Sequence, residues 1–418
     1  MIRARPVRLD RLADLEPAFL RMGLPTPARE YLAEKLPALH VLLTGLEREQ
    51  GRFLAGLFAA SEAPGREEFP AWVAGDQGSR PGTGLLSGRK EQFERVVAEA
   101  KARPELAELS EALARVLEAS QPPAPLVLGG RTFTFGARTH VMGVVNVTPD
   151  SFSDGGRYFG IGAAVAHGLR LAEAGADVLD VGGESTRPGS PPVPAEEELA
   201  RILPVIQGLR ARTDVPLSVD TTKAAVAREA LKAGAVLVND ISGFLFDSEL
   251  PRVTAEAGAA CCLMHIQGTP ETMQKDPRYE DVVDEVLAFL EDGVARAVAA
   301  GVPRERVLVD PGIGFGKTLG HNLFLLRRLD ELRVLGLPLL VGTSRKGFLG
   351  KLTGGKPATE RLAATLGSVA TLAAAGNADF VRVHDVAEAR DALVVADAVR
   401  TALEGGSLYQ PARGKVRD

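Results

Sequence analysis

Residues 138–405 contain eight apolar, strand-like segments that alternate with amphipathic, helix-like segments. Most of the strand-like segments are continuous runs of Val, Leu and Ala rather than alternations of apolar and polar residues. Such runs are typical of parallel sheets that are covered on both faces. Eight regular repeats predict an α/β fold, a (β/α)8 TIM barrel, with a doubly wound open sheet as the alternative. The eight segments are HVMGVVNV, ADVLDVGG, PLSVDT, AVLVNDIS, AACCLMHI, RVLVDPG, PLLVGTS and ADFVRVHDV.

The chain of 418 residues is longer than the roughly 250 residues at which single hydrophobic cores stop growing, so we expect two units. The Pro-rich segment QPPAP (Gln121–Pro125) marks the boundary. The predicted divisions are an N-terminal extension of unknown function at 1–120, a linker and hairpin at 121–137, the barrel at 138–405 and a C-terminal tail at 406–418.

The N-terminal extension is predicted to be a smaller, mostly helical or α/β domain. Helical spacing of apolar residues occurs at 10–23, 27–39, 47–62, 89–102 and 105–120. A strand is predicted at 82–88, and the Gly- and Pro-rich stretch at about 62–84 is predicted to be a long loop. Because the extension has no phosphate loop, metal-ligand cluster or basic stripe, we expect an interaction or dimer-supporting module rather than a second enzyme.

Composition narrows the class of protein. The net charge of −5 argues against a general nucleic-acid binder. The two cysteines, Cys261 and Cys262, are adjacent in an apolar run, which is typical of a reduced core pair in the cytoplasm. No apolar run approaches the roughly 20 residues that span a bilayer, and charges interrupt the basic N-terminus, which argues against a secretory signal. We therefore expect a soluble, cytoplasmic protein.

Polar side chains stand at the carboxyl end of each predicted strand. In a barrel of parallel strands these ends converge on one rim, where active sites lie. Asp220, Asn239, Asp310 and Lys346 can line a pocket of fixed donors and acceptors, which suits a flat heterocycle with N–H and C=O edges. An ion pair between Lys346 and an aspartate is compatible with this role, because an unpaired buried charge is costly.

The same rim carries positive charge. Arg382 and His384 are two residues apart on a predicted strand, so their side chains share one face. Together with Arg187 and Lys346, they predict a site for an anion such as phosphate. Ser344 precedes the helical stretch KGFLGKL and is predicted to cap it, which would add a helix N-terminus to the anion site.

Several long motifs resemble those of the dihydropteroate synthases. NVTPDSFSDGG (Asn146–Gly156) resembles the first signature of that family, and DVGGESTRPGS (Asp180–Ser190) resembles the second. SVDTTK, VNDISG, MHIQGTPETMQ, DPGIGFGK, GTSRKGF and RVHDV follow in the family order. The resemblance covers about residues 125–405 and implies a (β/α)8 barrel, usually a homodimer, that acts in folate biosynthesis.

The resemblance also implies a reaction. The family joins 4-aminobenzoate to 6-hydroxymethyl-7,8-dihydropterin diphosphate, and releases diphosphate and 7,8-dihydropteroate by an SN1-like course. The two small molecules are thus the expected partners, and Mg²⁺, riding on the diphosphate, is the expected cofactor. Asp220, Asp310, Lys346, Arg382 and His384 are the implied catalytic residues, with both aspartates stabilising positive charge on the ring.

Further roles follow from the same resemblance. Asp220, Asn239, Asp310 and Lys346 are expected to hold the pterin ring, and Arg382 and His384 the diphosphate. The remaining implied positions are Asn146 at Mg²⁺, Thr186 in the substrate site, Arg187 and Ser344 near the aminobenzoate, Asp150 and Phe152 in the first loop, and Phe315 and Lys317 closing the site.

Two other functions remain open from the residues. A pterin-dependent methyltransferase barrel shares the ring-binding half, but it has no need of a diphosphate site. A catalytically silent barrel that serves as a binding partner is the second, although such proteins usually lose loop residues. The motif NVTPDSFSDGG together with Arg382 and His384 favours the synthase.

Overall fold

The computed structural model describes residues 3–7, 39–61, 71–74, 82–119, 121–148 and 156–402. The chain forms two compact units, and the division falls between Pro122 and Pro123, within the Pro-rich segment. The first unit comprises Met1–Pro122 and also Arg328–Gly336, a short stretch from the second half of the chain. The second comprises Pro123–Arg327 and Leu337–Asp418. The predicted tail at 406–418 lies outside the described residues.

The N-terminal unit contains a four-stranded antiparallel sheet with the strand order β1-β2-β4-β3. Its strands are β1 (Arg3–Val7), β2 (Leu39–Thr44), β3 (Ala71–Ala74) and β4 (Gly84–Gly88), and its helices are α3 (Arg48–Ser61), α4 (Lys90–Lys101), η2 (Pro104–Leu106) and α5 (Ala107–Glu118). The helices predicted within 47–62, 89–102 and 105–120 and the strand at 82–88 are confirmed. The helices predicted at 10–23 and 27–38 lie outside the described residues.

Two predictions for this unit are wrong. The predicted loop at 62–84 contains β3, which pairs antiparallel with β4 so that Ala71 lies opposite Ser87. Trp72 and Val73 favour an extended backbone, but they stand in a stretch whose Gly, Pro and charged residues conceal the strand. Leu39, predicted as the last residue of a helix, instead begins β2, where pairing with β4 decides its conformation.

The second unit is built on an eight-stranded parallel sheet with the order β12-β11-β10-β9-β8-β7-β14-β13. A parallel bridge between Val309 and Leu339 joins the two ends of this order and closes the barrel. The eight strands are β7 (His140–Asn146), β8 (Val178–Gly182), β9 (Leu217–Asp220), β10 (Leu237–Asp240), β11 (Ala260–Met264), β12 (Val307–Asp310), β13 (Leu340–Val341) and β14 (Phe380–Val383). The predicted closed barrel is confirmed, and the open sheet is not found.

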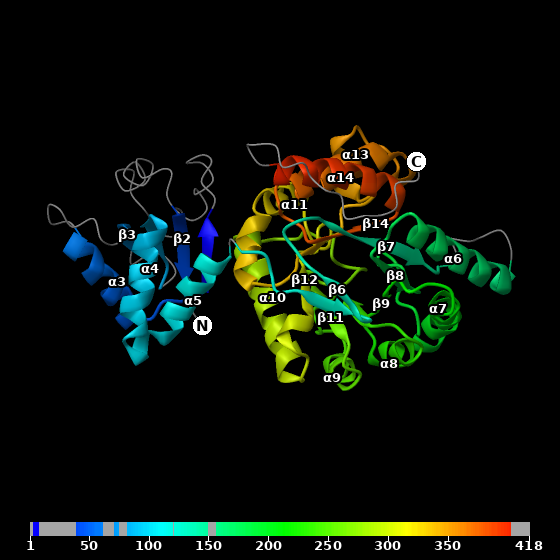
Figure 1. Ribbon diagram of the computed structural model, residues 1–418, viewed down its shortest axis with the longest axis horizontal. Helices are drawn as coiled ribbons and strands as arrows, with labels where there is room; N and C mark the ends of the chain where they lie inside the picture. Colours follow the sequence, from blue (N-terminus) through cyan, green and yellow to red (C-terminus); the bar gives the residue numbers. More distant parts are fainter. Residues whose placement is uncertain are drawn as a thin grey trace. The chain divides into compact units, whose positions relative to one another are not determined.

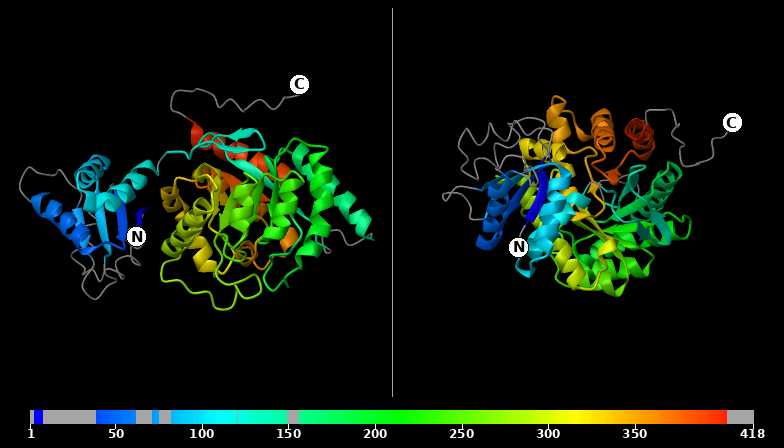
Figure 2. Two further views of the ribbon diagram at one scale, coloured as in Figure 1. Left: turned by 90° about the horizontal axis from the view of Figure 1, so that it is seen from below. Right: turned by 60° about the vertical axis from the view of Figure 1, so that its left-hand side comes forward.

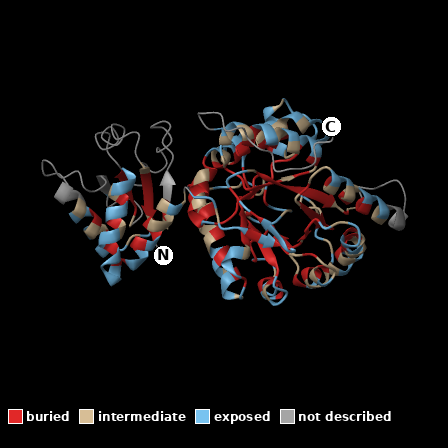
Figure 3. Ribbon diagram, viewed as in Figure 1, coloured by how far each residue is buried: buried red, intermediate tan, exposed pale blue. Residues whose placement is uncertain are grey.

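Helices surround the barrel and cover the outer face of its sheet (Figures 1 and 2). They are α6 (Gly156–Glu173), α7 (Ala195–Arg210), α8 (Ala224–Lys232), α9 (Leu250–Glu256), α10 (Val282–Ala299), α11 (Leu319–Arg327), α12 (Gly347–Leu352), α13 (Leu362–Ala374) and α14 (Val386–Thr401), with short turns η4 (Arg304–Arg306) and η6 (Ala358–Glu360). The strands are buried while the outer helix surfaces are exposed (Figure 3). A third short turn, η5 (Leu329–Leu335), is the part of this region that belongs to the first unit. Within the described ranges, none of the helices combines the length and the apolar character needed to cross a membrane.

A hairpin of β5 (Leu126–Leu128) and β6 (Arg131–Phe133), predicted from the sequence, packs against the amino ends of the barrel strands. Its inward side chains, Leu126, Leu128 and Phe133, are buried in one cluster with the first inward residues of the strands. That cluster also contains Phe135, Met142, Val178, Leu237, Ala260, Cys262, Leu308, Leu340 and Phe380. The hairpin therefore closes one end of the barrel with an apolar layer and leaves the carboxyl ends of the strands as the polar end.

Candidate active site

The carboxyl ends of four barrel strands bring the predicted residues to one rim. Asp220, the last residue of β9, is paired in register with Asn239 of β10. Asp310 ends β12, and Arg382 lies in β14. Because all eight strands are parallel, these side chains reach the same rim of the barrel, as the sequence predicts.

Arg382 is the centre of a network of charged groups. Its Nε donates to Asp180 Oδ2 at 2.6 Å, and its Nη2 donates to Asp220 Oδ2 at 2.7 Å. The Asp180 side chain is fully buried, whereas the Arg382 side chain keeps 22% of its surface exposed. Burial raises the pKa of Asp220 to about 7, although the positive charge of Arg382 opposes this shift. Arg382 thus balances two carboxylates and still presents an exposed edge to the rim.

Asn239 is tied to the same network. Its side chain is 5% exposed, and its Nδ2 donates to Asp180 Oδ2 at 3.0 Å. One carboxylate oxygen therefore accepts hydrogen bonds from both the predicted ring-binding amide and the predicted anion-binding arginine.

Asp310 and Lys346 form the opposite wall. Asp310 Oδ1 accepts a hydrogen bond of 2.7 Å from the backbone N–H of Gly312. Burial raises the pKa of Asp310, and the positive charge of Lys346 opposes the shift. Lys346 donates to the carbonyl of Ile313, and its Nζ lies 4.6 Å from the centroid of the Phe315 ring. Burial lowers the pKa of Lys346 to about 8, so its amine is mostly charged at pH 7.

Ser344 and His384 form a hydrogen-bonded pair. The backbone N–H of His384 donates to Ser344 Oγ at 3.2 Å, and this oxygen lies 3.0 Å from His384 Nδ1. The serine hydroxyl can donate to Nδ1, and in that arrangement the ring proton is on Nε2. Burial is the main cause that lowers the pKa of His384, the charge of Arg382 adds to it, and the resulting pKa is about 3. At neutral pH His384 thus contributes an N–H donor and not a positive charge.

The prediction that Ser344 caps the following helix is wrong. The residue at the N-cap position of α12 is Lys346, and no side chain caps the helix there. Arg345, between them, has a positive φ of 58°, a conformation unusual for a residue other than glycine. Both carboxylate oxygens of Asp385 accept hydrogen bonds from its guanidinium, which holds this turn in place. The turn directs Ser344 to His384 instead of to the helix.

Lys317 supports the loop that carries Phe315. Its Nζ lies 2.8 Å from His265 Nδ1, 3.0 Å from the carbonyl of Gly312 and 3.1 Å from the carbonyl of Phe315. Burial lowers the pKa of Lys317 well below its ordinary value, and the charge of Lys346 adds to the effect. Lys317 therefore anchors this loop through three polar contacts.

The other predicted positions lie at the edge of the rim. Asn146, the last residue of β7, is half-buried and pairs in register with Gly182. Thr186 is half-buried and Arg187 is exposed on the loop after β8. The charge of Arg187 contributes to the lowered pKa of His384, which places the two side chains in the same region. Asp150 and Phe152 lie outside the described residues.

Comparisons with known proteins agree with this geometry. The family model for pterin binding enzymes matches residues 142–384. A dihydropteroate synthase from Synechocystis sp. is 48% identical over 277 residues, which cover 66% of this chain and 96% of that protein. The chain belongs to the dihydropteroate synthase family.

Solved structures of this family have the same barrel. The dihydropteroate synthase of Xanthomonas albilineans with 4-aminobenzoic acid matches with a TM-score of 0.63 and 47% identity, and covers 67% of this chain and 100% of that one. The same enzyme in complex with 7,8-dihydropteroate matches with a TM-score of 0.60 and 45% identity over the same shares. The predicted barrel, the transferase class and the synthase function are confirmed, and the synthase is favoured over the methyltransferase and the silent barrel.

One member of this synthase site, Asp180, is not predicted from the sequence. It is the first residue of the motif DVGGESTRPGS, and its contacts with Arg382 and Asn239 appear only in the structure. A signal for it is present in the sequence, because an aspartate inside the apolar run VLDVG is buried and therefore needs a partner.

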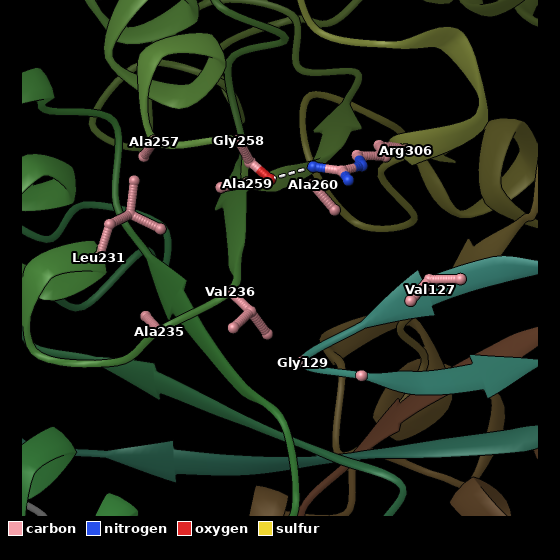
Figure 4. Close-up of a pocket in the computed structure, with 11 residues that line it drawn as sticks. Val127, Gly129, Leu231, Ala235, Val236, Ala257, Gly258, Ala259, Ala260 and Arg306 are labelled. Carbon is pink, nitrogen blue, oxygen red and sulfur yellow. Dashed lines mark hydrogen bonds between the residues drawn. The ribbon is translucent and has the colours of Figure 1, made fainter.

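A separate hollow of about 200 Å³ lies away from the synthase site (Figure 4). The turn of the β5–β6 hairpin and the segments that precede β10, β11 and β12 line it, with Val127, Val236 and Arg306 among its side chains. Arg306 turns toward the carbonyl of Gly258, to which it donates a hydrogen bond. None of the predicted site residues that the structure describes lines this hollow.

Proposed function

We propose that the chain condenses 6-hydroxymethyl-7,8-dihydropterin diphosphate with 4-aminobenzoate, and releases diphosphate and 7,8-dihydropteroate. The observation that carries this proposal is the position of Arg382 between two kinds of site. Its guanidinium pairs with Asp220 beside the heterocycle pocket, and His384, two residues further along, extends the donors toward an anion. One rim thus offers both a ring pocket and an anion site within reach of a single CH₂ group.

The pocket is suited to the pterin ring. Asp310 and Asn239 are buried, and their carboxylate and amide groups present hydrogen-bonding edges rather than apolar surface. Lys346 adds a donor, and the Phe315 ring beneath its amine adds an apolar face. A flat ring that carries N–H and C=O groups along its edges satisfies such a set, whereas a purely apolar ligand would leave buried polar atoms unpaired.

The chemistry follows from the charges. The bond between the CH₂ carbon and the diphosphate oxygen breaks, and its electron pair leaves with the oxygen. Arg382 stabilises the negative charge that grows on the leaving oxygen, and the carboxylates of Asp220 and Asp310 stabilise the positive charge left on the ring. The aminobenzoate nitrogen then uses its lone pair to form the new C–N bond, and it loses one proton.

Asn146 is the proposed protein ligand of Mg²⁺. An amide oxygen is a hard donor, and the residue stands half-buried at the rim, at the end of β7. In the described part of the chain no cluster of three or more His, Cys, Asp or Glu side chains could hold a metal by itself. This fits Mg²⁺, which commonly takes one or two protein oxygens and fills its other positions with substrate phosphate and water. A bound Mg²⁺ supplies positive charge to the diphosphate.

Loop residues complete the proposal. Thr186 and Arg187, after β8, are placed to contact the substrates at the outer edge of the rim, where Arg187 can face the carboxylate of 4-aminobenzoate. Ser344 reaches the same region through His384. Asp150 and Phe152 belong to the motif NVTPDSFSDGG, and we assign them to closure over the substrates on the family resemblance alone.

The test of the ring pocket is Asp310→Asn. This change keeps the size of the side chain but removes its charge, so we expect weaker binding of free pterin in calorimetry. Asp379→Asn is the matched control, because Asp379 is also an aspartate with 5% exposure but accepts from the backbone N–H of Leu339, before β14 begins. Equal pterin affinity in the two variants would refute the pocket assignment.

A homodimer in the cytoplasm completes the proposal. Val395 and Val399 are four residues apart on α14 and are 65% and 69% exposed, so they form an apolar face on this helix. We assign this face to a second copy of the chain, and Val395→Glu should shift the mass measured by light scattering toward that of a monomer. An unchanged mass would place the interface elsewhere.

The buried free thiols of Cys261 and Cys262 fit a reducing compartment.

A further inference from the structure

Asp180 occupies the middle of β8 and has no exposed surface. Its neighbours in register are Val144 of β7 and Ser218 of β9. A carboxylate in such a position is unfavourable unless charged or polar partners compensate for the loss of water. Asp180 has two such partners, Arg382 at 2.6 Å and Asn239 at 3.0 Å, and both donate to the same oxygen, Oδ2.

The contact determines the orientation of the Asn239 amide. A carboxylate that is paired with a guanidinium accepts hydrogen bonds and does not donate them. The NH₂ group of Asn239 must therefore face Asp180, and the amide oxygen is left as the other polar atom of the side chain. Asn239 thus presents an acceptor to the pocket, which selects the N–H edge of a heterocycle rather than a C=O edge.

The second contact fixes the plane of the Arg382 guanidinium. Asp180 accepts a hydrogen bond from Nε and Asp220 accepts one from Nη2, so two separate hydrogen bonds hold the rigid, planar guanidinium. A guanidinium has five N–H donors, and three remain on Nη1 and Nη2. Without Asp180, Arg382 would keep a single carboxylate partner and could rotate about that contact.

We propose that Asp180 is a positioning residue that aligns both halves of the site, Arg382 for the leaving diphosphate and Asn239 for the pterin ring. The inference rests on the proposed function, because it assigns those two residues their ligands. It adds a residue that touches neither substrate and acts through two that do.

Charge alone and positioning predict opposite effects of removing Asp180 on the affinity for an anion, which makes the proposal testable. Removing a negative charge beside Arg382 should tighten the binding of an anion if charge alone matters. If Asp180 aligns Arg382, Asp180→Ala should instead weaken the binding of inorganic diphosphate. We expect a loss of roughly 10- to 100-fold, the scale on which misplaced groups lose function.

Asp180→Asn separates the two effects. Its amide oxygen can take the place of Oδ2 and accept from both donors, while its NH₂ takes the place of Oδ1. Within the described residues Oδ1 has no hydrogen-bond partner, so the new NH₂ meets no opposing donor there. Both variants lose the same charge, but only Asp180→Asn keeps the alignment, so it should restore the affinity for diphosphate and for free pterin that Asp180→Ala loses.

The experiment measures the affinity of the full chain for inorganic diphosphate and for free pterin by calorimetry, with thermal unfolding to confirm the fold. Asp379→Ala, which removes another buried carboxylate, should leave both affinities unchanged. Asp180→Ser replaces Asp180→Ala if the latter does not fold, because its hydroxyl is too short to reach both donors.

Three outcomes are decisive, one against the anion site and two against the positioning role. If Arg382→Ala leaves diphosphate affinity unchanged, the anion site of the proposed function is wrong. If Arg382→Ala weakens diphosphate binding but Asp180→Ala or Asp180→Ser binds it as tightly as the unmodified chain, or more tightly, the positioning role is wrong. Equal losses in Asp180→Asn and Asp180→Ala would also overturn it, because the charge and not the alignment would then be responsible.

Discussion

We expect Ser344 to determine which ring nitrogen of His384 carries the proton, and Ser344→Ala tests this prediction. The serine is 6% exposed, and its oxygen takes part in two contacts with His384, at 3.0 and 3.2 Å. A hydrogen bond inside a protein contributes about 0.5–1.5 kcal/mol net. Losing both contacts should therefore lower the free energy of unfolding by about 1–3 kcal/mol, measured by urea denaturation.

The same substitution should change the imidazole itself. Without the serine hydroxyl, nothing in this pair fixes Nδ1 as the acceptor, so the proton can move between the two nitrogens. Nitrogen NMR at pH 7 should show the proton on Nε2 in the unmodified chain and a mixture in Ser344→Ala. The pKa of His384 should also rise from about 3, because the neutral ring loses a hydrogen bond that favours it.

Ser368→Ala provides the control. Ser368 also has two hydrogen bonds, one with Thr343 at 2.8 Å and one to the carbonyl of Thr365 at 2.7 Å, but it does not contact His384. It should lose stability on the same scale without changing the His384 signals. A proton on Nδ1 in the unmodified chain, or identical His384 spectra in both variants, would refute the reasoning.

Three further predictions concern stability. The pKa of His384 is lower in the folded chain than the ordinary 6.5, so the neutral His384 ring contributes fully to stability above pH 6.5, and this contribution is lost as the pH falls toward about 3. His384→Gln should therefore lose less stability on acidification than the unmodified chain. Parallel curves of unfolding free energy against pH for the two proteins would contradict this. Phe133→Ala should lower the free energy of unfolding by about 3–5 kcal/mol, because the ring is 4% exposed in the layer that closes the barrel; a change below 1 kcal/mol (roughly what one methylene contributes) would show that the hairpin is dispensable. Gly312→Ala should fold poorly, since a Cβ there would lie 1.8 Å from the carbonyl oxygen of His265 and φ is +66°; a normal melting temperature would show that the loop can move aside.

The sequence predicted the barrel and most of the site because both depend on regular patterns. Each buried strand is a short apolar run, and each run ends in polar residues, so strand order and rim position follow together. Asp220, Asn239, Asp310 and Arg382 were found in this way, and the structure places all four at the carboxyl ends of their strands.

What the sequence could not predict depends on contacts between distant residues. Ser344 was expected to cap α12, but the positive φ of Arg345 and its pairing with Asp385 direct the serine to His384. The charge state of His384 follows from burial and from the nearby Arg382, and neither is visible in local spacing. Likewise β3 exists because β4 lies beside it.

The position of Asp180 in the site follows from the spacing of inward-facing residues along a strand. We call the apolar cluster under the β5–β6 hairpin the apolar floor of the barrel. Because inward-facing residues are two apart, the next layer of side chains lies two residues beyond this floor in each strand. Phe380, Leu308 and Leu237 belong to that floor, and Arg382, Asp310 and Asn239 follow each of them by two. Asp180 follows the floor residue Val178 by the same step and so belongs to the same polar layer.

This two-residue step also explains why the pKa values of the charged side chains in the site are shifted. The polar layer stands directly on a layer of Leu, Val, Phe and Cys side chains, which the hairpin shields from water on its far side. Burial is accordingly the largest cause of the raised pKa of Asp220 and Asp310 and of the lowered pKa of Lys346. In such surroundings each charge needs a fixed partner, and partners fixed before substrate arrives require no rearrangement when charge develops on the leaving diphosphate. The apolar floor therefore contributes to the chemistry as well as to stability.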